Sequence, residues 1–234
     1  KHTTYLCGLT EDGQYLGHIY YGKRMTDLSA SYLLRTEEPP FTPETNAREK
    51  ASFIGCFPQE YPTAGLGDYR ETALAVRMET GHRGCELHYE KHEIFHGKKS
   101  LAGLPATFGS EEECETLEII LKDELLDLKV VLRFSVFEDV DVIARSVQII
   151  NAGTAPLYLE KVLSACLDMD NEGFEMMTLT GAWARERQIE RTPLSRGRHQ
   201  IGSWRGESSH QEHPFLALVT PGTNQDMGEV YAMH

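Results

Sequence analysis

The stretch Cys114–Asn151, CETLEIILKDELLDLKVVLRFSVFEDVDVIARSVQIIN, decides the fold class of this chain. It contains three runs rich in Val, Ile and Leu that are punctuated by Asp, a pattern typical of consecutive β-strands. Residues at every second position of a strand share one face. We therefore expect one face to carry Leu128, Val130, Leu132, Phe134 and Val136, and the other Val131, Arg133, Ser135 and Phe137.

Strand-like runs continue on both sides of this stretch, separated by short turn signals such as EDG, ETG, NAGTAP and TPGTN. The additional runs are YLCGL, YLGHIYYG, ALAVRMET, LHYEKHEIFH, LYLEKVLSACLDM, FLALV and EVYAM. No long amphipathic run and no strand–helix alternation occur, which favours an antiparallel sandwich over a doubly wound parallel sheet. We expect one all-β domain over residues 1–234, trimmed at both ends because no initiator Met is present and the chain stops within EVYAMH.

The composition narrows the function classes. A formal net charge of −13 argues against nucleic acid and anionic membrane surfaces as partners, because both bind clustered cations. No window approaches the length of apolar sequence that a membrane-spanning helix needs. The five cysteines are scattered and form no CxxC pair. This usage is typical of reduced thiols in a cytoplasmic protein rather than of a disulfide framework.

One long segment, Arg35–Glu71, interrupts the rhythm of strands and turns. It is rich in Pro, Gly and charged residues, and loops of this length in compact domains are usually functional or disordered. Its aromatic content argues against disorder, since disordered segments are poor in aromatic residues. The aromatic residues are Phe41, Phe53, Phe57, Tyr61 and Tyr69. We expect an ordered loop that reaches the surface.

The motif HEIFH, from His92 to His96, matches the zinc-protease pattern HExxH. That chemistry requires a helix, because one helical turn brings both imidazoles to the same face. Here the segment alternates like a strand and Gly97 follows at once. We therefore predict a strand that carries His88, His92 and His96 on one face, and no bound metal.

Acidic pairs are frequent, but none lies in a pattern that marks a catalytic cleft. A retaining glycosidase needs two carboxyl groups about 5–5.5 Å apart. Asp123-Glu124 is interpreted as a solvated turn, and Asp168 and Asp170 follow an apolar run without a cleft signal nearby. Phosphate-binding loops, GxSxG elbows and Cys–His nucleophile signatures do not occur. We predict no catalytic residue in this chain and no cofactor.

Six motifs occur in the order LGHIYYGKRM, FTP, EYPTAGLGDYRE, KHEIFHGKKSLAGLPATF, GAWARERQIERTPL and SSHQEHPFLAL. Together they resemble the N-terminal domain of family 36 α-galactosidases. The resemblance implies a large antiparallel β-supersandwich, similar to galactose mutarotase, that precedes a catalytic (β/α)8 barrel. Both catalytic Asp residues of these retaining enzymes lie on that barrel, and their motifs do not occur in this sequence. The family hydrolyses terminal α-D-galactosyl residues of melibiose- and raffinose-type oligosaccharides, and this chain alone is expected to be inactive.

The resemblance assigns substrate contacts to two residues of this chain. Trp183, in Gly-Ala-Trp, would present its indole to a galactose ring, and the charged residues after it favour an exposed position over a core position. Glu38, three residues before Phe41, would accept hydrogen bonds from sugar hydroxyls in the pocket of a neighbouring subunit within a homotetramer. Where the family has an Asp-Arg pair this chain has Glu38-Pro39, so Glu37 remains a rival for the same role.

Four further polar residues in the shared motifs are interpreted as structural or interfacial. Asp68 and Arg70 in GLGDYRE form an Asp-x-Arg pattern that suits an ion pair at the base of the long loop. His210 and Gln211 in SSHQ are expected at the contact with the barrel.

Three functions of different classes follow. The first is an accessory domain of an α-galactosidase that supports the barrel, the oligomer and the substrate pocket. The second is a mutarotase-like enzyme, which needs a His–Glu acid/base pair, and no such pair is evident from the sequence. The third is a free carbohydrate-binding module, which needs an exposed aromatic platform that two tryptophans barely supply.

Overall fold

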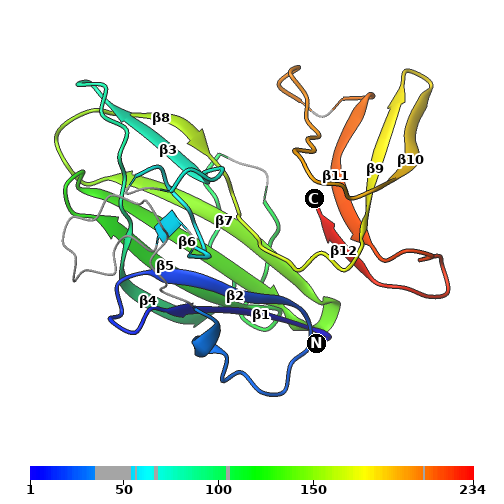
Figure 1. Cartoon of the computed structure of the whole chain (residues 1–234), viewed down its shortest axis with the longest axis horizontal. Helices are drawn as coiled ribbons and strands as arrows, with labels where there is room; N and C mark the ends of the chain where they lie inside the picture. The colour runs from blue at the N-terminus through cyan, green and yellow to red at the C-terminus, as the bar shows by residue number, and fades with distance from the viewer. Residues whose placement is uncertain (35–53, 56, 66–67, 104–105, 208) are drawn as a thin grey trace. The chain divides into compact units, whose positions relative to one another are not determined.

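The computed structural model describes residues 1–34, 54–55, 57–65, 68–103, 106–207 and 209–234 (Figure 1). Within them the chain forms mainly strands, with short 3-10 helices that include Ser31–Leu33 and Glu138–Val140. The predicted all-β class is therefore confirmed. The chain divides into two compact units, Lys1–Met169 and Asp170–His234, which are described separately below. No helix in the described ranges is long and apolar enough to cross a membrane.

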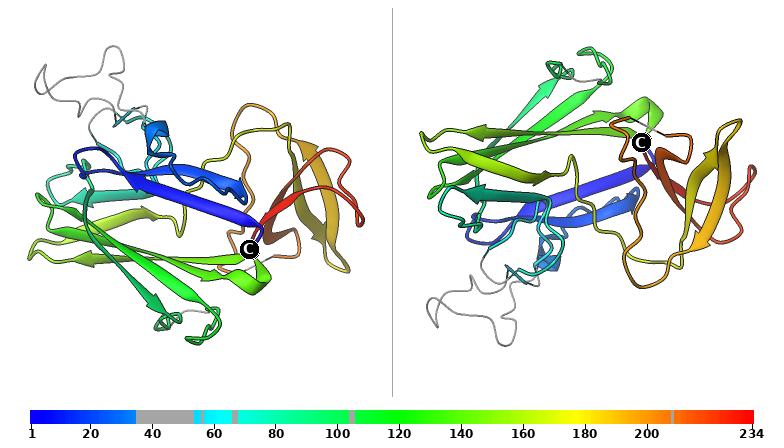
Figure 2. Two further views of the ribbon diagram at one scale, coloured as in Figure 1. Left: turned by 90° about the horizontal axis from the view of Figure 1, so that it is seen from below. Right: turned by 90° about the horizontal axis from the view of Figure 1, so that it is seen from above.

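The first unit contains three antiparallel sheets. Their strand orders are β1-β2, β3-β8 and β4-β5-β6-β7. The strands are β1 (Thr3–Leu9), β2 (Leu16–Lys23), β3 (Leu74–Met78), β4 (His88–His96), β5 (Glu115–Asp123), β6 (Leu128–Phe137), β7 (Val142–Asn151) and β8 (Leu157–Val162). Figure 2 shows the blue β1–β2 ribbon as a layer beside the green β4–β7 sheet. Apolar residues from all three sheets, including Leu16, Leu74 and Leu132, form one hydrophobic core.

The alternation expected along β6 is confirmed for its first four core positions. Leu128, Val130, Leu132 and Phe134 are all buried. Val136 belongs to the same face by its register but is 42% exposed. Val136 pairs with Glu115, the first residue of β5, so it lies where the sheet extends beyond the core. The period of two fixes the face of a side chain but not whether the opposite layer reaches it.

The opposite face of β6 is also partly buried, which alternation alone does not predict. Val131 and Ser135 are almost fully buried. Ser135 Oγ lies 2.7 Å from Thr116 Oγ1 on β5, and the Thr116 hydroxyl donates to the Gly97 carbonyl. The segment that follows β4 therefore contacts this end of the sheet through Gly97.

The strand expected over Leu157–Met169 is shorter than predicted. β8 ends at Val162, opposite Leu74, the first residue of β3. One further backbone hydrogen bond, from the Leu163 amide to the Ala73 carbonyl at 2.8 Å, continues this pairing just outside the two strands. The Leu163 carbonyl accepts the Tyr61 hydroxyl at 2.7 Å, which also ties this segment to the long loop.

The second unit is one antiparallel sheet with the strand order β10-β9-β11-β12. Its strands are β9 (Glu175–Ala182), β10 (Arg185–Pro193), β11 (Glu212–Val219) and β12 (Val230–Met233). Runs for β11 and β12 are predicted from the sequence, whereas the β9–β10 hairpin is not. β10 is an exposed edge strand, and charged side chains on edge strands replace the apolar alternation that marks a strand in sequence.

Candidate functional site

The motif GAWARER forms the turn of the β9–β10 hairpin. Ala182 pairs with Arg185 across it, which leaves Trp183 and Ala184 as the two connecting residues. Ala184 has a left-handed backbone with φ 60°. Gly181 has φ 154°, and a Cβ there would lie 2.3 Å from the Arg185 carbonyl oxygen. Only glycine fits that position, so the motif itself specifies a tight turn with the tryptophan at its tip.

Trp183 is 79% exposed and has one aromatic neighbour among the described residues. The His210 ring meets it edge to face, with ring centroids 5.4 Å apart and an interplanar angle of 85°. Nδ1 of His210 lies 3.3 Å from Oε1 of Glu186. The same carboxylate oxygen accepts the Ala184 amide at 2.9 Å. Trp183, His210, Glu186 and the turn backbone thus form one connected cluster, called here the indole cluster.

The electrostatics of the indole cluster favour a charged Glu186. Hydrogen bonds from its own amide and from the Ala184 amide hold the pKa of the Glu186 carboxyl below its usual range. His210 and Arg187 lower this pKa further. The backbone of the turn already holds this carboxylate by hydrogen bonds. The indole cluster therefore suits binding of a ligand better than general acid–base catalysis. An exposed indole of this kind suits the apolar C–H face of a sugar ring.

The predicted exposure of Trp183 is confirmed, and the structure adds partners that the sequence does not indicate. His210 belongs to a motif 27 positions along the chain and reaches the hairpin because β11 pairs with β9. The Gly181 amide donates to the Gln211 carbonyl at 3.0 Å. His210 and Gln211 therefore both contact the β9–β10 hairpin, as expected for structural residues.

Glu38, the second candidate contact, lies outside the described residues, as does its rival Glu37. Their roles stay predictions.

The expected ion pair at the base of the long loop is confirmed. Arg70 Nη2 lies 2.9 Å from Oδ2 of the buried Asp68, and Arg70 Nε lies 2.9 Å from its Oδ1. The same guanidinium donates to the carbonyls of Ile54 and Phe57. Phe57 and Tyr61 are themselves buried. The described part of this segment is therefore packed into the unit.

HEIFH lies on β4, so the predicted strand is confirmed. The expectation that its three histidines share a face is wrong. His92 pairs with Ile119 and His88 with Lys122, three positions apart on β5, because a β-bulge lies between them. His88 therefore faces away from His92 and His96. Among the described residues, no group of three or more His, Cys, Asp or Glu side chains could hold a metal ion.

The structure does bring together a His–Glu pair that the sequence does not reveal. Nδ1 of His18 lies 3.1 Å from Glu60 Oε2, and Arg145 Nη2 and the Tyr5 hydroxyl both contact Glu60 Oε1, at 2.9 and 2.5 Å. The side chains of His18 and Glu60 are only 4% and 0% exposed. A general acid or base must come within hydrogen-bonding distance of the substrate. This buried pair therefore has a structural role instead.

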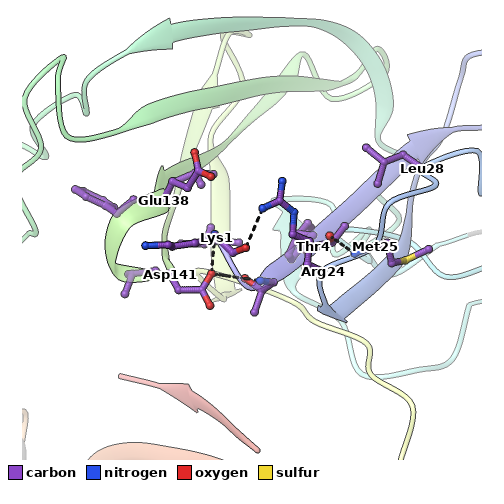
Figure 3. A pocket seen from close by; sticks show the side chains of 13 residues that line it. Lys1, Thr4, Arg24, Met25, Leu28, Glu138 and Asp141 are labelled. Atoms are coloured by element: carbon purple, nitrogen blue, oxygen red, sulfur yellow. Dashed lines mark hydrogen bonds and ion pairs between the residues drawn. The ribbon is translucent and has the colours of Figure 1, made fainter.

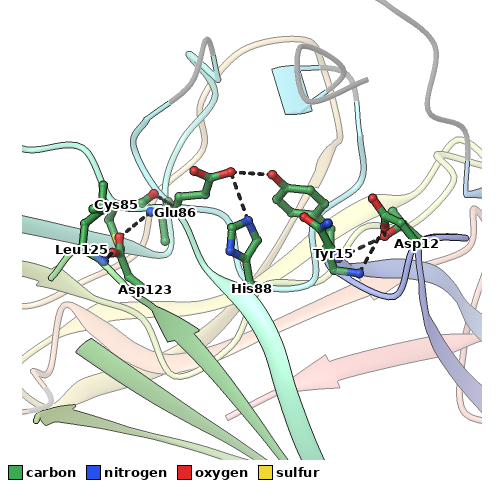
Figure 4. A network of polar contacts seen from close by, with 10 residues as sticks. Asp12, Tyr15, Cys85, Glu86, His88, Asp123 and Leu125 are labelled. Atoms are coloured by element: carbon green, nitrogen blue, oxygen red, sulfur yellow. Dashed lines mark hydrogen bonds and ion pairs between the residues drawn. The ribbon is translucent and has the colours of Figure 1, made fainter. Parts of the chain in front are cut away.

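A second pair, more accessible, joins the segment before β4 to the β1–β2 hairpin. Figure 4 shows Tyr15 and His88 both directed at Glu86, whose Oε1 accepts the Tyr15 hydroxyl and lies 3.1 Å from His88 Nε2. The His88 ring also stands edge to face on Tyr15, 5.0 Å between centroids. Burial and the Glu86 hydrogen bond raise the pKa of Tyr15. Since both contacts use one carboxylate oxygen, the group cross-links the two segments.

The expectation that Asp123 lies in a solvated turn is wrong. It is 4% exposed, not solvated. Its carboxylate accepts the amides of Leu125 and Leu126 at 2.9 Å and that of Glu86 at 2.7 Å (Figure 4). The side chain thus closes the β5–β6 turn from inside and anchors a neighbouring segment, whereas Glu124 next to it is exposed.

A hollow of about 360 Å³ lies between the start of β1, the end of β2 and the β6–β7 connection (Figure 3). Apolar side chains such as Met25 and Leu28 line it together with Arg24, Glu138 and Asp141. Oδ1 of Asp141 accepts the His2 amide and the Thr3 hydroxyl, both at 3.0 Å. That carboxylate therefore holds the start of β1 at the edge of the hollow.

The chain is similar to known proteins over nearly its whole length. The model of the glycosyl hydrolase family 36 N-terminal domain matches residues 14–234. The bifunctional alpha-galactosidase/sucrose kinase AgaSK of Mediterraneibacter gnavus is 41% identical over 99% of this chain and 25% of its own length. Alpha-galactosidase AgaA of Geobacillus stearothermophilus is 39% identical over 97% of this chain and 31% of its own length.

Solved structures agree with the sequence comparisons. A crystal structure of a variant of the family 36 alpha-galactosidase AgaA from Geobacillus stearothermophilus, in complex with raffinose, has a TM-score of 0.90 and 38% identity. It covers 99% of this chain and 32% of that chain. The galactosidase domain of AgaSK has a TM-score of 0.89 and 40% identity over the same share. This chain thus spans about a quarter to a third of the length of these relatives. The comparisons confirm the predicted β-supersandwich class. The chain belongs to the N-terminal domains of glycosyl hydrolase family 36.

Proposed function

We propose that this chain is the N-terminal part of a retaining α-galactosidase that removes terminal α-D-galactosyl residues from melibiose- and raffinose-type oligosaccharides. Its family membership and the names of its relatives support this proposal. The nucleophile and the acid/base would lie on a (β/α)8 barrel beyond residues 1–234, with no cofactor or metal required. The chain itself would support that barrel, the oligomer and the substrate pocket.

The observation that carries the proposal is the exposed indole of Trp183 on a rigid turn. Exposing a large aromatic side chain to water is unfavourable. A turn that requires glycine nevertheless holds this indole in solvent, which suits a role in binding a ligand. Its face would stack on the galactosyl ring and its N–H would donate to a hydroxyl group. None of the relatives named above is a mutarotase or a free binding module, so they support neither alternative.

Glu38 would complete the sugar contacts from a neighbouring subunit of a homotetramer, with Glu37 as its rival. Both carboxylates are suited to sugar hydroxyls as hydrogen-bond acceptors. A cytoplasmic location belongs to the same proposal. The free thiols of Cys7, Cys85, Cys114 and Cys166 support it, because disulfides are rare in that compartment.

The test compares Trp183→Ala with Trp204→Ala in the full-length protein. Trp204 is the matched control because it belongs to the same unit and is fully exposed. Loss of the sugar contact should lower kcat/KM on raffinose about tenfold or more for Trp183→Ala, since each 1.36 kcal/mol of transition-state stabilisation is tenfold in rate. Trp204→Ala should stay within about twofold of the parent. Equal kcat/KM for both variants would remove Trp183 from the substrate site.

Residues 1–234 alone should release no galactose from an aryl α-galactoside and should not accelerate galactose anomerisation. Parallel Glu38→Ala and Glu37→Ala variants of the full-length protein then assign the acidic role. The variant with the raised KM identifies the residue in contact with substrate, and light scattering measures whether four subunits assemble.

A further inference from the structure

We infer that Glu186 and His210 are positioning residues that hold the Trp183 indole in one orientation and thereby set the affinity of the sugar contact. The inference rests on the proposed function, because it concerns the same contact. Its evidence is separate, however, since it comes from the geometry of the indole cluster rather than from family membership.

The contacts form a continuous path from the turn backbone to the indole. Glu186 Oε1 accepts the Ala184 amide at 2.9 Å, so the carboxylate is fixed relative to the turn. The same oxygen lies 3.3 Å from His210 Nδ1, so it fixes the imidazole in turn. The imidazole then stands edge to face on Trp183, with 5.4 Å between centroids. That geometry is a favourable one for aromatic pairs.

The backbone reinforces this path from the other side. The Gly181 amide donates to the Gln211 carbonyl at 3.0 Å, which ties the residue after His210 to the residue two before Trp183. Both ends of the imidazole–indole contact are therefore anchored on the same pair of strands.

An exposed tryptophan needs such a support because solvent does not restrict its rotamers. At 79% exposure Trp183 has little packing to fix its side-chain torsions. Ordering a side chain on binding costs about 0.5–1.5 kcal/mol, which is about two- to tenfold in affinity. An indole that is already ordered avoids that loss. The lowered pKa of Glu186 supports the arrangement, because the carboxylate stays charged opposite His210 and Arg187.

The experiment is a double-mutant cycle in the full-length protein, with raffinose as substrate. His210→Ala and Glu186→Gln should each raise KM about two- to tenfold and leave kcat within about twofold. Combined with Trp183→Ala, neither should raise KM further, because a positioning residue has no effect once the residue that it positions is gone. His199→Ala and Glu190→Gln, which change exposed residues of the same unit, are the controls and should leave KM unchanged.

A second readout does not depend on activity. The fluorescence anisotropy of Trp183 is obtained as the difference between each protein and its Trp183→Phe counterpart. His210→Ala and Glu186→Gln should lower this anisotropy, while the two control variants should not. Unchanged melting temperatures for all variants would confirm that only the local support is lost.

The outcomes separate the inference from the proposed function. If Trp183→Ala leaves kcat/KM unchanged, the proposed sugar contact fails, and with it the claim about affinity, while the anisotropy still decides whether the indole is held. If Trp183→Ala raises KM but His210→Ala and Glu186→Gln change neither KM nor anisotropy, the positioning inference is overturned. A further rise in KM in the Trp183→Ala background would also overturn it, since His210 or Glu186 would then act directly.

Discussion

Replacement of Glu60 by Gln tests how strongly burial determines the contribution of an ion pair to the stability of this fold. Glu60 accepts the Arg145 guanidinium at 2.9 Å and the Tyr5 hydroxyl, and it lies beside His18. Its own side chain is 0% exposed and that of Arg145 is 12% exposed. Glutamine keeps the shape and one acceptor but removes the charge, so Arg145 would remain buried without a counter-charge.

The expected cost follows from that burial. Breaking a buried ion pair by removal of one partner destabilises a protein by about 3–5 kcal/mol, because the remaining charge is uncompensated. Arg145 Nε already has no hydrogen-bond partner among the described residues, so little local compensation exists. For a chain of this size, 1 kcal/mol changes the melting temperature by about 2–4 °C. We expect Glu60→Gln to lower the melting temperature by about 6–20 °C.

The matched control is Glu160→Gln. Glu160 also accepts arginine guanidinium groups at 2.9 Å, from Arg77 and Arg83, but it is 35% exposed. Exposed pairs contribute about 0–1 kcal/mol, so this variant should lose at most about 4 °C. Thermal unfolding of both variants and the parent at one pH and salt concentration gives the comparison. Equal losses would refute the argument that burial, rather than pair geometry, sets the energy.

Three further changes test other local contacts. Asp123→Ala leaves three amides without their acceptor and should cost about 1–3 kcal/mol in the free energy of unfolding, whereas Glu124→Ala should stay within about 0.5 kcal/mol. Gly181→Ala places a Cβ 2.3 Å from a carbonyl oxygen and should lower the melting temperature more than Gly13→Ala, which has open space and only the left-handed backbone cost of about 1–2 kcal/mol. Burial, with the charges of Asp168 and Glu60, raises the pKa of Cys166 to about 11, so its thiolate forms only at strongly alkaline pH. Iodoacetamide should therefore modify Cys166 much more slowly at pH 8 in the folded protein than in urea, as followed by peptide mass spectrometry.

The strands that face the core were predictable from sequence because burial constrains their residue types. The run through Leu128 and Leu132 alternates since one face contacts the core, and the strand lies where the pattern places it. The β9–β10 hairpin was not predictable in this way, because β10 faces solvent along most of its length. Only Gly181 marked its turn, and a single glycine does not distinguish a hairpin from a loop.

The candidate site likewise combines features that local sequence predicts with contacts that it does not predict. The exposure of Trp183 could be inferred from the charges that follow it, which are local in sequence. The pairing of Glu186 with His210 could not, because it depends on β11 lying beside β9. The His18–Glu60 pair is likewise separated by 42 positions and is brought together only by the tertiary fold. No short-range pattern carries information about contacts of that kind.

The two His–Glu pairs and the indole cluster show how one chemical pair serves different roles according to its surroundings. Fully buried, His18 and Glu60 contact each other and Arg145 inside the core and cannot reach a substrate. At about one-third exposure, His88 and Glu86 cross-link two segments and Tyr15 occupies the same carboxylate oxygen. In the indole cluster the imidazole of the pair also contacts a residue that is itself exposed to solvent. This third pair contacts the 79% exposed indole of Trp183, whereas the ring of His88 contacts the buried Tyr15 and His18 lies in the core. The third pair therefore supports an exposed side chain, while the other two stabilise buried contacts.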